Sequence, residues 1–264
     1  MKSFTFLFFS ILLTISTTIR AHEFWLEASS FYQEIDRTTE ITLNVGQQMD
    51  GQLLPNIPAW YRHFNVITDE GLKPVGGELG RDPAGYVYIQ TPGIYAIGYE
   101  STKKSVDLEP EKFTSYLKKE GLEKIIKRRN ELNENEKNGL EVYYRNVKAL
   151  IKVGDKTDIN FYNYDFNYPL NINPLQNPYE LSEGNDLRVQ LTFKQKPAAN
   201  LLLHAKIKNN PNFQFSIRTD AQGNAIVPLK HSGVWLLHTV EMIRSEQQGI
   251  DWESYWGSIT FEIR

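Results

Sequence analysis

The segment RTDAQGNAIVPLKHSGVWLLHTV, residues 218–240, carries the clearest fold signal in the chain. Its polar turn TDAQG precedes a short apolar run, and a second turn, KHSG, precedes a longer run that an aromatic residue leads. Apolar runs of this length between polar turns are typical of antiparallel strands with tight connections. The segment therefore predicts a β-hairpin with strands at 224–229 and 234–243.

The same alternation continues on both sides of this hairpin. Further apolar runs bounded by turn residues predict strands at 23–27, 41–46, 61–68, 85–90, 94–101, 186–194, 200–208, 213–218 and 255–263. Many short strands with regular turns indicate antiparallel sandwiches. The order of turns and strands in 218–240 also resembles small transthyretin-like and carboxypeptidase-regulatory-like sandwiches, a resemblance that concerns the fold alone.

Residues 109–132 and 139–155 break this pattern, because their apolar residues recur at helical spacing around the polar segment NENEKN. We therefore expect a mostly β protein with two antiparallel β-sandwich units, of immunoglobulin or transthyretin-like type, and a two-helix insertion between them. The expected divisions are a signal peptide at 1–21, an N-terminal β-sandwich at 22–107, a helical hairpin at 108–155 and a C-terminal transthyretin-like β-sandwich with its leading linker at 156–264.

The first 21 residues have the layout of a secretory leader. Lys2 precedes an apolar run at 4–15, and small and polar residues lead to Ala21. We expect cleavage after Ala21, which makes His22 the first residue of a periplasmic or secreted chain; an uncleaved anchor helix is the alternative. No later stretch is apolar and long enough to cross a membrane.

The amino-acid composition limits the types of reaction and binding site that this protein can have. The 264 residues include 41% hydrophobic and 23% charged residues and a net charge of −3, which is a globular composition without the basic surface of a nucleic-acid-binding protein. There is no cysteine, so thiolate nucleophiles, thiolate metal ligands and disulfides are excluded. No nucleotide-binding or hydrolase motif is present. A metal site would need imidazole, carboxylate or amine ligands.

His22 is the strongest metal-ligand candidate among the five histidines. As an N-terminal residue it would offer its α-amine and its ring Nδ1 to one ion, an arrangement that suits Cu(II) and Ni(II). The alternative is that histidine follows the cleavage site by chance.

Four other residues are weaker candidates. The strand at 234–243 has two largely apolar faces, so Glu241 needs a cationic partner or a metal ion, and His238 is a ligand or a hydrogen-bonded core histidine. We expect His63 to be half exposed and Glu253 to lie in an aromatic strand, where it either faces the same cavity as Glu241 or only packs. His204 shares a face with two lysines and is expected to point to solvent.

Several segments, in this order, resemble one bacterial exported family, domain of unknown function 4198: AHEFWLE, YLKKEGLEKI, YYRNVKALIKVG, PLNINPLQNPYEL and DWESYWGSITFEI. Members are usually described as periplasmic substrate-binding components of nickel or cobalt uptake. The resemblance matches His22 to the family's leading histidine and Glu23 to its acidic follower. It implies a histidine where this chain has Glu241, which puts nickel or copper selectivity in doubt.

Three hypotheses follow. The first is a periplasmic protein that binds a divalent transition metal (Ni, Co or Cu) through His22, Glu241 and one of His63 or His238, with Glu253 nearby, and that hands it to components of a metal-uptake transporter without catalysing a reaction. The second is a metal-free adhesion or scaffold protein. The third is a copper enzyme that oxidises polysaccharide with its N-terminal histidine. Nucleic acid and a membrane span in the mature chain are not expected.

Overall fold

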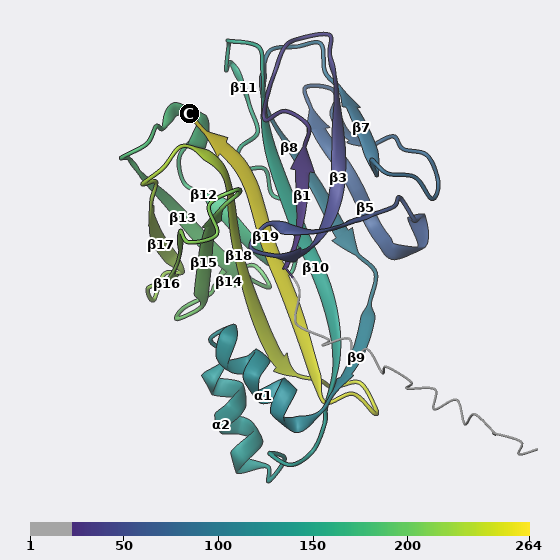
Figure 1. Cartoon of the computed structure of the whole chain (residues 1–264), viewed down its shortest axis with the longest axis vertical. Helices are drawn as coiled ribbons and strands as arrows, with labels where there is room; N and C mark the ends of the chain where they lie inside the picture. Colours follow the sequence, from purple (N-terminus) through teal and green to yellow (C-terminus); the bar gives the residue numbers. More distant parts are fainter. Residues whose placement is uncertain (1–22) are drawn as a thin grey trace, which may run out of the picture.

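An 11-stranded sheet runs through the computed structural model, which describes residues 23–264 (Figure 1). Its main path has the order β16-β15-β18-β19-β10-β8-β5-β6, and three short strands, β2, β9 and β11, join its sides. The bounds are β2 Tyr32–Gln33, β5 Tyr61–Thr68, β6 Gly71–Pro74, β8 Gly93–Ser101, β9 Lys104–Leu108, β10 Gly139–Val153, β11 Ile159–Asn160, β15 Leu202–Ile207, β16 Gln214–Arg218, β18 Gly233–Arg244 and β19 Trp252–Ile263.

Two four-stranded sheets complete the β structure. One has the order β1-β3-β4 with β7 beside β3, and the other has the order β12-β13-β14 with β17 beside β13. Their bounds are β1 Glu23–Ala28, β3 Thr38–Gln47, β4 Asp50–Leu54, β7 Gly85–Tyr88, β12 Leu170–Pro174, β13 Asp186–Phe193, β14 Lys196–Pro197 and β17 Asn224–Pro228. Every strand predicted from the sequence is present, and the predicted mostly β fold is confirmed. The predicted hairpin between 224–229 and 234–243 is wrong, because β17 pairs with β13 of a small sheet whereas β18 pairs with β15 and β19 of the central sheet.

The small sheets pack against the central sheet through separate cores. Leu26 and Ile41 of the β1-β3 sheet lie in one core with Ala149 and Ile151 of β10, whereas Leu150 belongs to the core that the β12-β13 sheet covers. Successive side chains of a strand point to opposite faces of its sheet. The two small sheets therefore cover opposite faces of the central sheet around β10.

The prediction of a helix at 139–155 is wrong, because these residues form β10. Apolar residues at helical spacing misled the prediction, since a strand that is buried on both faces has no polar–apolar alternation. β10 pairs in parallel with β19, from Glu141 opposite Trp252 to Ala149 opposite Thr260, and antiparallel with β8. This parallel pair departs from the expected purely antiparallel arrangement. Through its pairing with both β8 and β19, β10 brings strands of the N-terminal and C-terminal halves into one sheet. The domain boundaries stay a prediction.

Both α-helices lie within the other predicted helical segment: α1 at Pro110–Lys119 and α2 at Glu123–Glu131. Pro110 starts α1, where its fixed φ suits the first helical turn, and Gly121 separates the helices at φ +68°. Phe113, Leu117 and Ile125 bury the hairpin against Val240 and Trp252. Figure 1 shows it beside one end of β18 and β19.

Two short 3₁₀ helices, Pro58–Trp60 and Pro178–Glu180, complete the secondary structure. Within residues 23–264, none of the helices has the length and apolar character that a membrane crossing requires.

Candidate functional site

Two stacked histidines lie at the junction of β1, α1 and the central sheet. His204 of β15 stands directly opposite His238 of β18 in the antiparallel register. Directly opposed residues share a face, so their rings stack with centroids 4.6 Å apart and planes 13° apart. Along β18, Leu236 packs on Trp25 of β1, whereas Val240 packs on the helical hairpin. His238 lies between these two contacts.

Each histidine has a buried carboxylate beside it. Glu120, which caps the C-terminal end of α1, has its Oε2 3.6 Å from His204 Nε2. Glu23, the first residue of β1, has its Oε1 3.9 Å from His238 Nε2 and is ion-paired with Lys206 Nζ. These separations exceed hydrogen-bonding distance. The carboxylates therefore approach the imidazoles without binding them directly.

The site gathers an unusual number of unsatisfied polar atoms. Among residues 23–264, ten buried side-chain nitrogen and oxygen atoms have no hydrogen-bond partner, and five of them lie here. They are Glu23 Oε2, Glu120 Oε2, His204 Nε2 and both ring nitrogens of His238. Buried polar groups are normally paired, so these five atoms together offer donors and acceptors for a ligand, ion or water.

The electrostatic environment keeps both imidazoles neutral. Burial, together with the positive charges of Lys206 and Lys119, lowers the pKa of His204 to about 4. Burial and the neighbouring His204 hold the pKa of His238 well below its usual range. Neutral imidazole is the form that ligates a metal ion. Both rings are therefore in their ligating form at neutral pH.

A pocket of 370 Å³ reaches this site. Its lining includes both histidines together with Lys119, Lys206 and Ser216. Ser216 Oγ lies 2.8 Å from His204 Nδ1, so this hydrogen bond engages Nδ1 and leaves Nε2 free to face the carboxylate of Glu120. The site is therefore buried but has access for a small ion.

The residues that the structure describes do not form a complete metal site. Within 23–264, no three histidine, aspartate or glutamate side chains are arranged to hold a metal ion. His22, the leading candidate from the sequence, lies outside the described residues. It directly precedes Glu23 in the chain, so the sequence supplies one further ligand candidate next to this cluster.

Glu241 and His63 are engaged elsewhere. The carboxylate of Glu241 is buried, and Lys124 of α2 supplies its countercharge at 2.5 Å. His63 has a side chain that is 59% exposed, and its Nε2 lies 3.9 Å from Oε2 of Glu100 on the neighbouring strand. The structure does not bring these two residues to the histidine pair.

The carboxylate of Glu253 is also occupied by hydrogen bonds from neighbouring residues. It accepts hydrogen bonds from Ser245 at 3.0 Å, Gln247 at 2.8 Å and Tyr255 at 3.1 Å. Although burial opposes ionisation, these hydrogen bonds hold the pKa of Glu253 below its ordinary value. Of the candidate ligands that the sequence suggested within residues 23–264, only His238 belongs to the cluster.

Sequence reasoning missed His204 and Glu120. His204 alternates with Lys206 and Lys208, which suggested a solvent-facing side of β15, but β1 covers this side through the ion pairs of Glu23 with Lys206 and Glu27 with Lys208. The available signal was that Glu23 and Glu27, four residues apart, share one face of β1 and offer two carboxylates to a lysine-bearing strand. Glu120 offered no signal, because helix packing alone buries it.

Comparison with protein families identifies the chain. A family model described as Domain of unknown function (DUF4198) matches residues 19–242. The chain belongs to the DUF4198 family. This confirms the resemblance found in the sequence, and the family's description assigns no function. No curated protein matches the sequence.

Two solved structures match this DUF4198 chain at low sequence identity. The D0-D1 domain of Intimin is 12% identical over 89% of this chain and 96% of that chain, with a TM-score of 0.21. The trypsin-activated alpha-2-macroglobulin of Escherichia coli is 10% identical over 91% of this chain, with a TM-score of 0.21. This chain spans 15% of that protein's length.

Proposed function

We propose that this protein is a periplasmic binding protein for a divalent transition metal, nickel, cobalt or copper. The observation that carries the proposal is the stacked pair His204–His238, buried, uncharged and with three ring nitrogens that no described residue engages. Nitrogen ligands of this kind suit these metals. Removal of the leader after Ala21 would add the amine and ring of His22 beside Glu23.

The proposed ligands are buried ring and carboxylate atoms that have no hydrogen-bond partner among the described residues. His204 Nε2 and a ring nitrogen of His238 are the imidazole ligands, and Glu120 Oε2 is the nearest carboxylate oxygen to His204. The rings are nearly parallel, and a metal ion binds in the plane of an imidazole. One ring must therefore turn about its side-chain torsion before both can hold the same ion.

The wider proposal concerns fold and partners. Each small sheet faces the central sheet across its own apolar core, which supports two sandwich units as the framework of the site. A binding protein of this type would pass its ion to components of a metal-uptake transporter. The helical hairpin carries Glu120 and lies at one end of the sheet, so it is the element through which a partner could reach the ion.

The test is metal titration of the mature chain that begins at His22. Calorimetry with Ni(II), Co(II), Cu(II) and Zn(II) should show saturable binding of one ion, and unfolding should shift to higher temperature. A metal at 100 times its Kd adds about 2.7 kcal/mol to the unfolding free energy if it binds only the native state. His204→Ala and His238→Ala should each weaken binding, whereas the exposed His63→Ala should not.

A second variant tests whether the N-terminal α-amine of His22 binds the metal. A single glycine added before His22 removes the α-amine from the chelate and leaves every described residue unchanged. We expect it to weaken Cu(II) and Ni(II) most, because these metals favour nitrogen-rich sites. If no metal shifts the unfolding temperature, the metal-free scaffold hypothesis replaces this proposal; reductant-dependent peroxide formation by the copper-loaded protein would instead favour the oxidative enzyme.

A further inference from the structure

Arg129 of α2 is a buried guanidinium without a carboxylate partner. Its side chain is 2% exposed, and no acidic residue within 23–264 forms an ion pair with it. Glu134 and Asp251 lie near enough to influence the pKa of Arg129, but both form ion pairs with Arg244. A buried cation normally has an anion beside it, since its desolvation is otherwise uncompensated.

Only one end of the guanidinium is engaged. Nη2 donates hydrogen bonds to the backbone oxygens of Lys137 at 2.6 Å and Asn135 at 3.5 Å, and the group lies 4.9 Å from the ring centre of Phe113. These contacts hold Arg129 in place. Within the described chain, Nε and Nη1 donate no hydrogen bond, so one edge of the donor fork is available.

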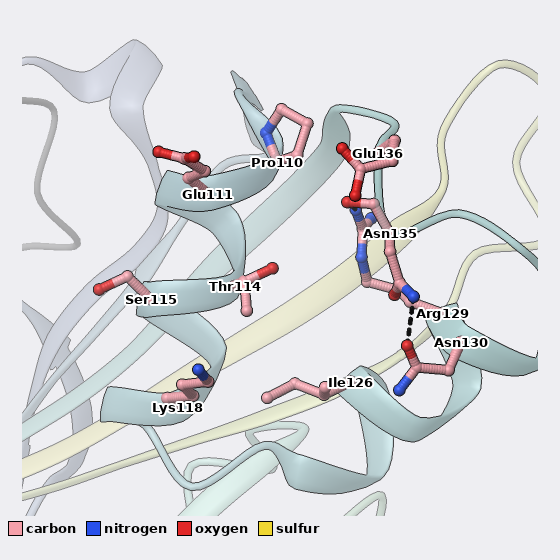
Figure 2. Close-up of a pocket in the computed structure, with 10 residues that line it drawn as sticks. All are labelled: Pro110, Glu111, Thr114, Ser115, Lys118, Ile126, Arg129, Asn130, Asn135 and Glu136. Carbon is pink, nitrogen blue, oxygen red and sulfur yellow. Dashed lines mark hydrogen bonds between the residues drawn. The ribbon is translucent and has the colours of Figure 1, made fainter.

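Arg129 is also one of the residues that line a pocket of 520 Å³ between the two helices and the loop that follows them. Figure 2 shows Thr114 on the α1 side of the pocket, with Arg129 and Asn130 on the α2 side. Lys118 adds a second positive charge to the lining, and Asn130 accepts a hydrogen bond from Asn135, which fixes the loop. The pocket thus combines a fixed guanidinium on the α2 side with an ammonium on the α1 side and with neutral polar groups.

We propose that this pocket binds a small monocarboxylate, whose anionic group occupies the free edge of Arg129. The planar guanidinium matches a carboxylate in a two-bonded arrangement, and Lys118 adds a long-range attraction. Glu111 and Glu136 also lie among the lining residues, although Glu111 points away from α2 in Figure 2. Their charges disfavour an anion with two or more negative charges, which is why a monocarboxylate is preferred over phosphate.

This site is independent of the proposed metal site, since it shares no residue with the histidine pair. The test is titration of the whole mature protein with lactate, alanine and inorganic phosphate, followed through the amide resonances of Thr114 and Asn130 and the Nε–H resonance of Arg129. Saturable shifts with lactate or alanine, but weaker ones with phosphate, are expected. Tighter binding of phosphate, or no saturable shift with any of the three, would overturn the proposal.

Variants separate binding from a structural role of Arg129. Arg129→Gln should weaken carboxylate binding by at least about tenfold, the loss expected for a charge-assisted hydrogen bond. Lys118→Met changes an exposed side chain and should weaken binding about threefold without loss of stability, because only a screened charge is removed. The matched control Arg128→Gln, whose side chain is 53% exposed and paired with Glu131, should bind normally. Equal binding by Lys118→Met and Arg129→Gln would refute the assignment.

Discussion

Glu141 shows at the scale of one residue how this fold handles buried charge. It lies on β10 beneath α1, where Tyr116 Oη donates to its Oε1 at 3.2 Å and Ser254 Oγ donates to the same oxygen. Its Oε2 has no partner among the described residues. Burial outweighs these hydrogen bonds and raises the pKa of Glu141 to about 7. The protonated form is therefore the one that the folded state favours.

This shift predicts a stability that declines as the pH rises. The folded-state pKa lies above the ordinary value of 4.5, so the folded protein holds more protons than the unfolded chain between pH 4.5 and about 7. The contribution of Glu141 is fully present below pH 4.5 and is lost by about pH 7, at a total of about 3 kcal/mol. Glu141→Gln should therefore be more stable than the parent at pH 8 and nearly equal at pH 4.5.

Urea unfolding at the two pH values provides the measurement. Burial also raises the pKa of Glu120 to about 7, but Glu120 is present in both proteins, so the difference between them isolates Glu141. An advantage of the variant that is the same at both pH values would contradict the assigned protonation.

At the scale of the element, the helical hairpin depends on the turn at Gly121. This residue has φ +68°, and a Cβ there would lie 2.7 Å from Leu202 Cδ2. The turn sets the angle at which α2 returns to the sheet, where Glu123 pairs with Arg218 at 2.9 Å. Glycine supplies both the backbone conformation and the space.

Gly121→Ala should lower the free energy of unfolding by roughly 2 kcal/mol, of which about 1 kcal/mol is backbone strain. The matched control is Gly249→Ala, because Gly249 has a similar φ of +76° and no atom within 4 Å of a Cβ. Denaturant unfolding of both variants measures the difference. An equal loss in the two would show that Leu202 moves aside and that packing at the turn contributes nothing.

In the molecule as a whole, β10 connects strands from the N-terminal and C-terminal halves of the chain. It pairs with β8 and β9 on one side, over residues 93–96 and 104–108, and with β19 on the other, over 252–260. Both large cores include residues of β10. Separation of the two halves would break this sheet and expose both cores.

We therefore expect one cooperative unfolding transition for the described chain. Circular dichroism and tryptophan fluorescence should give the same midpoint in urea, because no half can unfold while β10 keeps its partners. Native-state hydrogen exchange adds the sharper measurement: protected amides of β8 and β19 should open with the same free energy. Two transitions, or a lower opening energy for one strand, would support separate domains at 22–107 and 156–264.

Most of the longer strands other than β10, and the family, could be predicted from the sequence alone. Short apolar runs between turn residues are local signals, so β5 was predicted at its observed bounds, 61–68, and both strands of the segment 218–240 were predicted close to their observed positions. Their pairing as a hairpin was not a local property and was predicted wrongly. The composition also limited any metal site to imidazole, carboxylate and amine ligands, because it contains no cysteine. These conclusions need only neighbouring residues or a residue count.

Which residues lie together in space depends on the tertiary structure. Strand alternation placed His204 on one face of β15 but could not show that β1 covers this face, nor that the end of α1 brings Glu120 beside it. The tertiary structure likewise decided that 139–153 is a strand, since packing on both faces determines its state more than its spacing does. Local sequence sets the direction of a side chain, whereas its surroundings come from segments that are distant in the sequence, such as β1 and the end of α1.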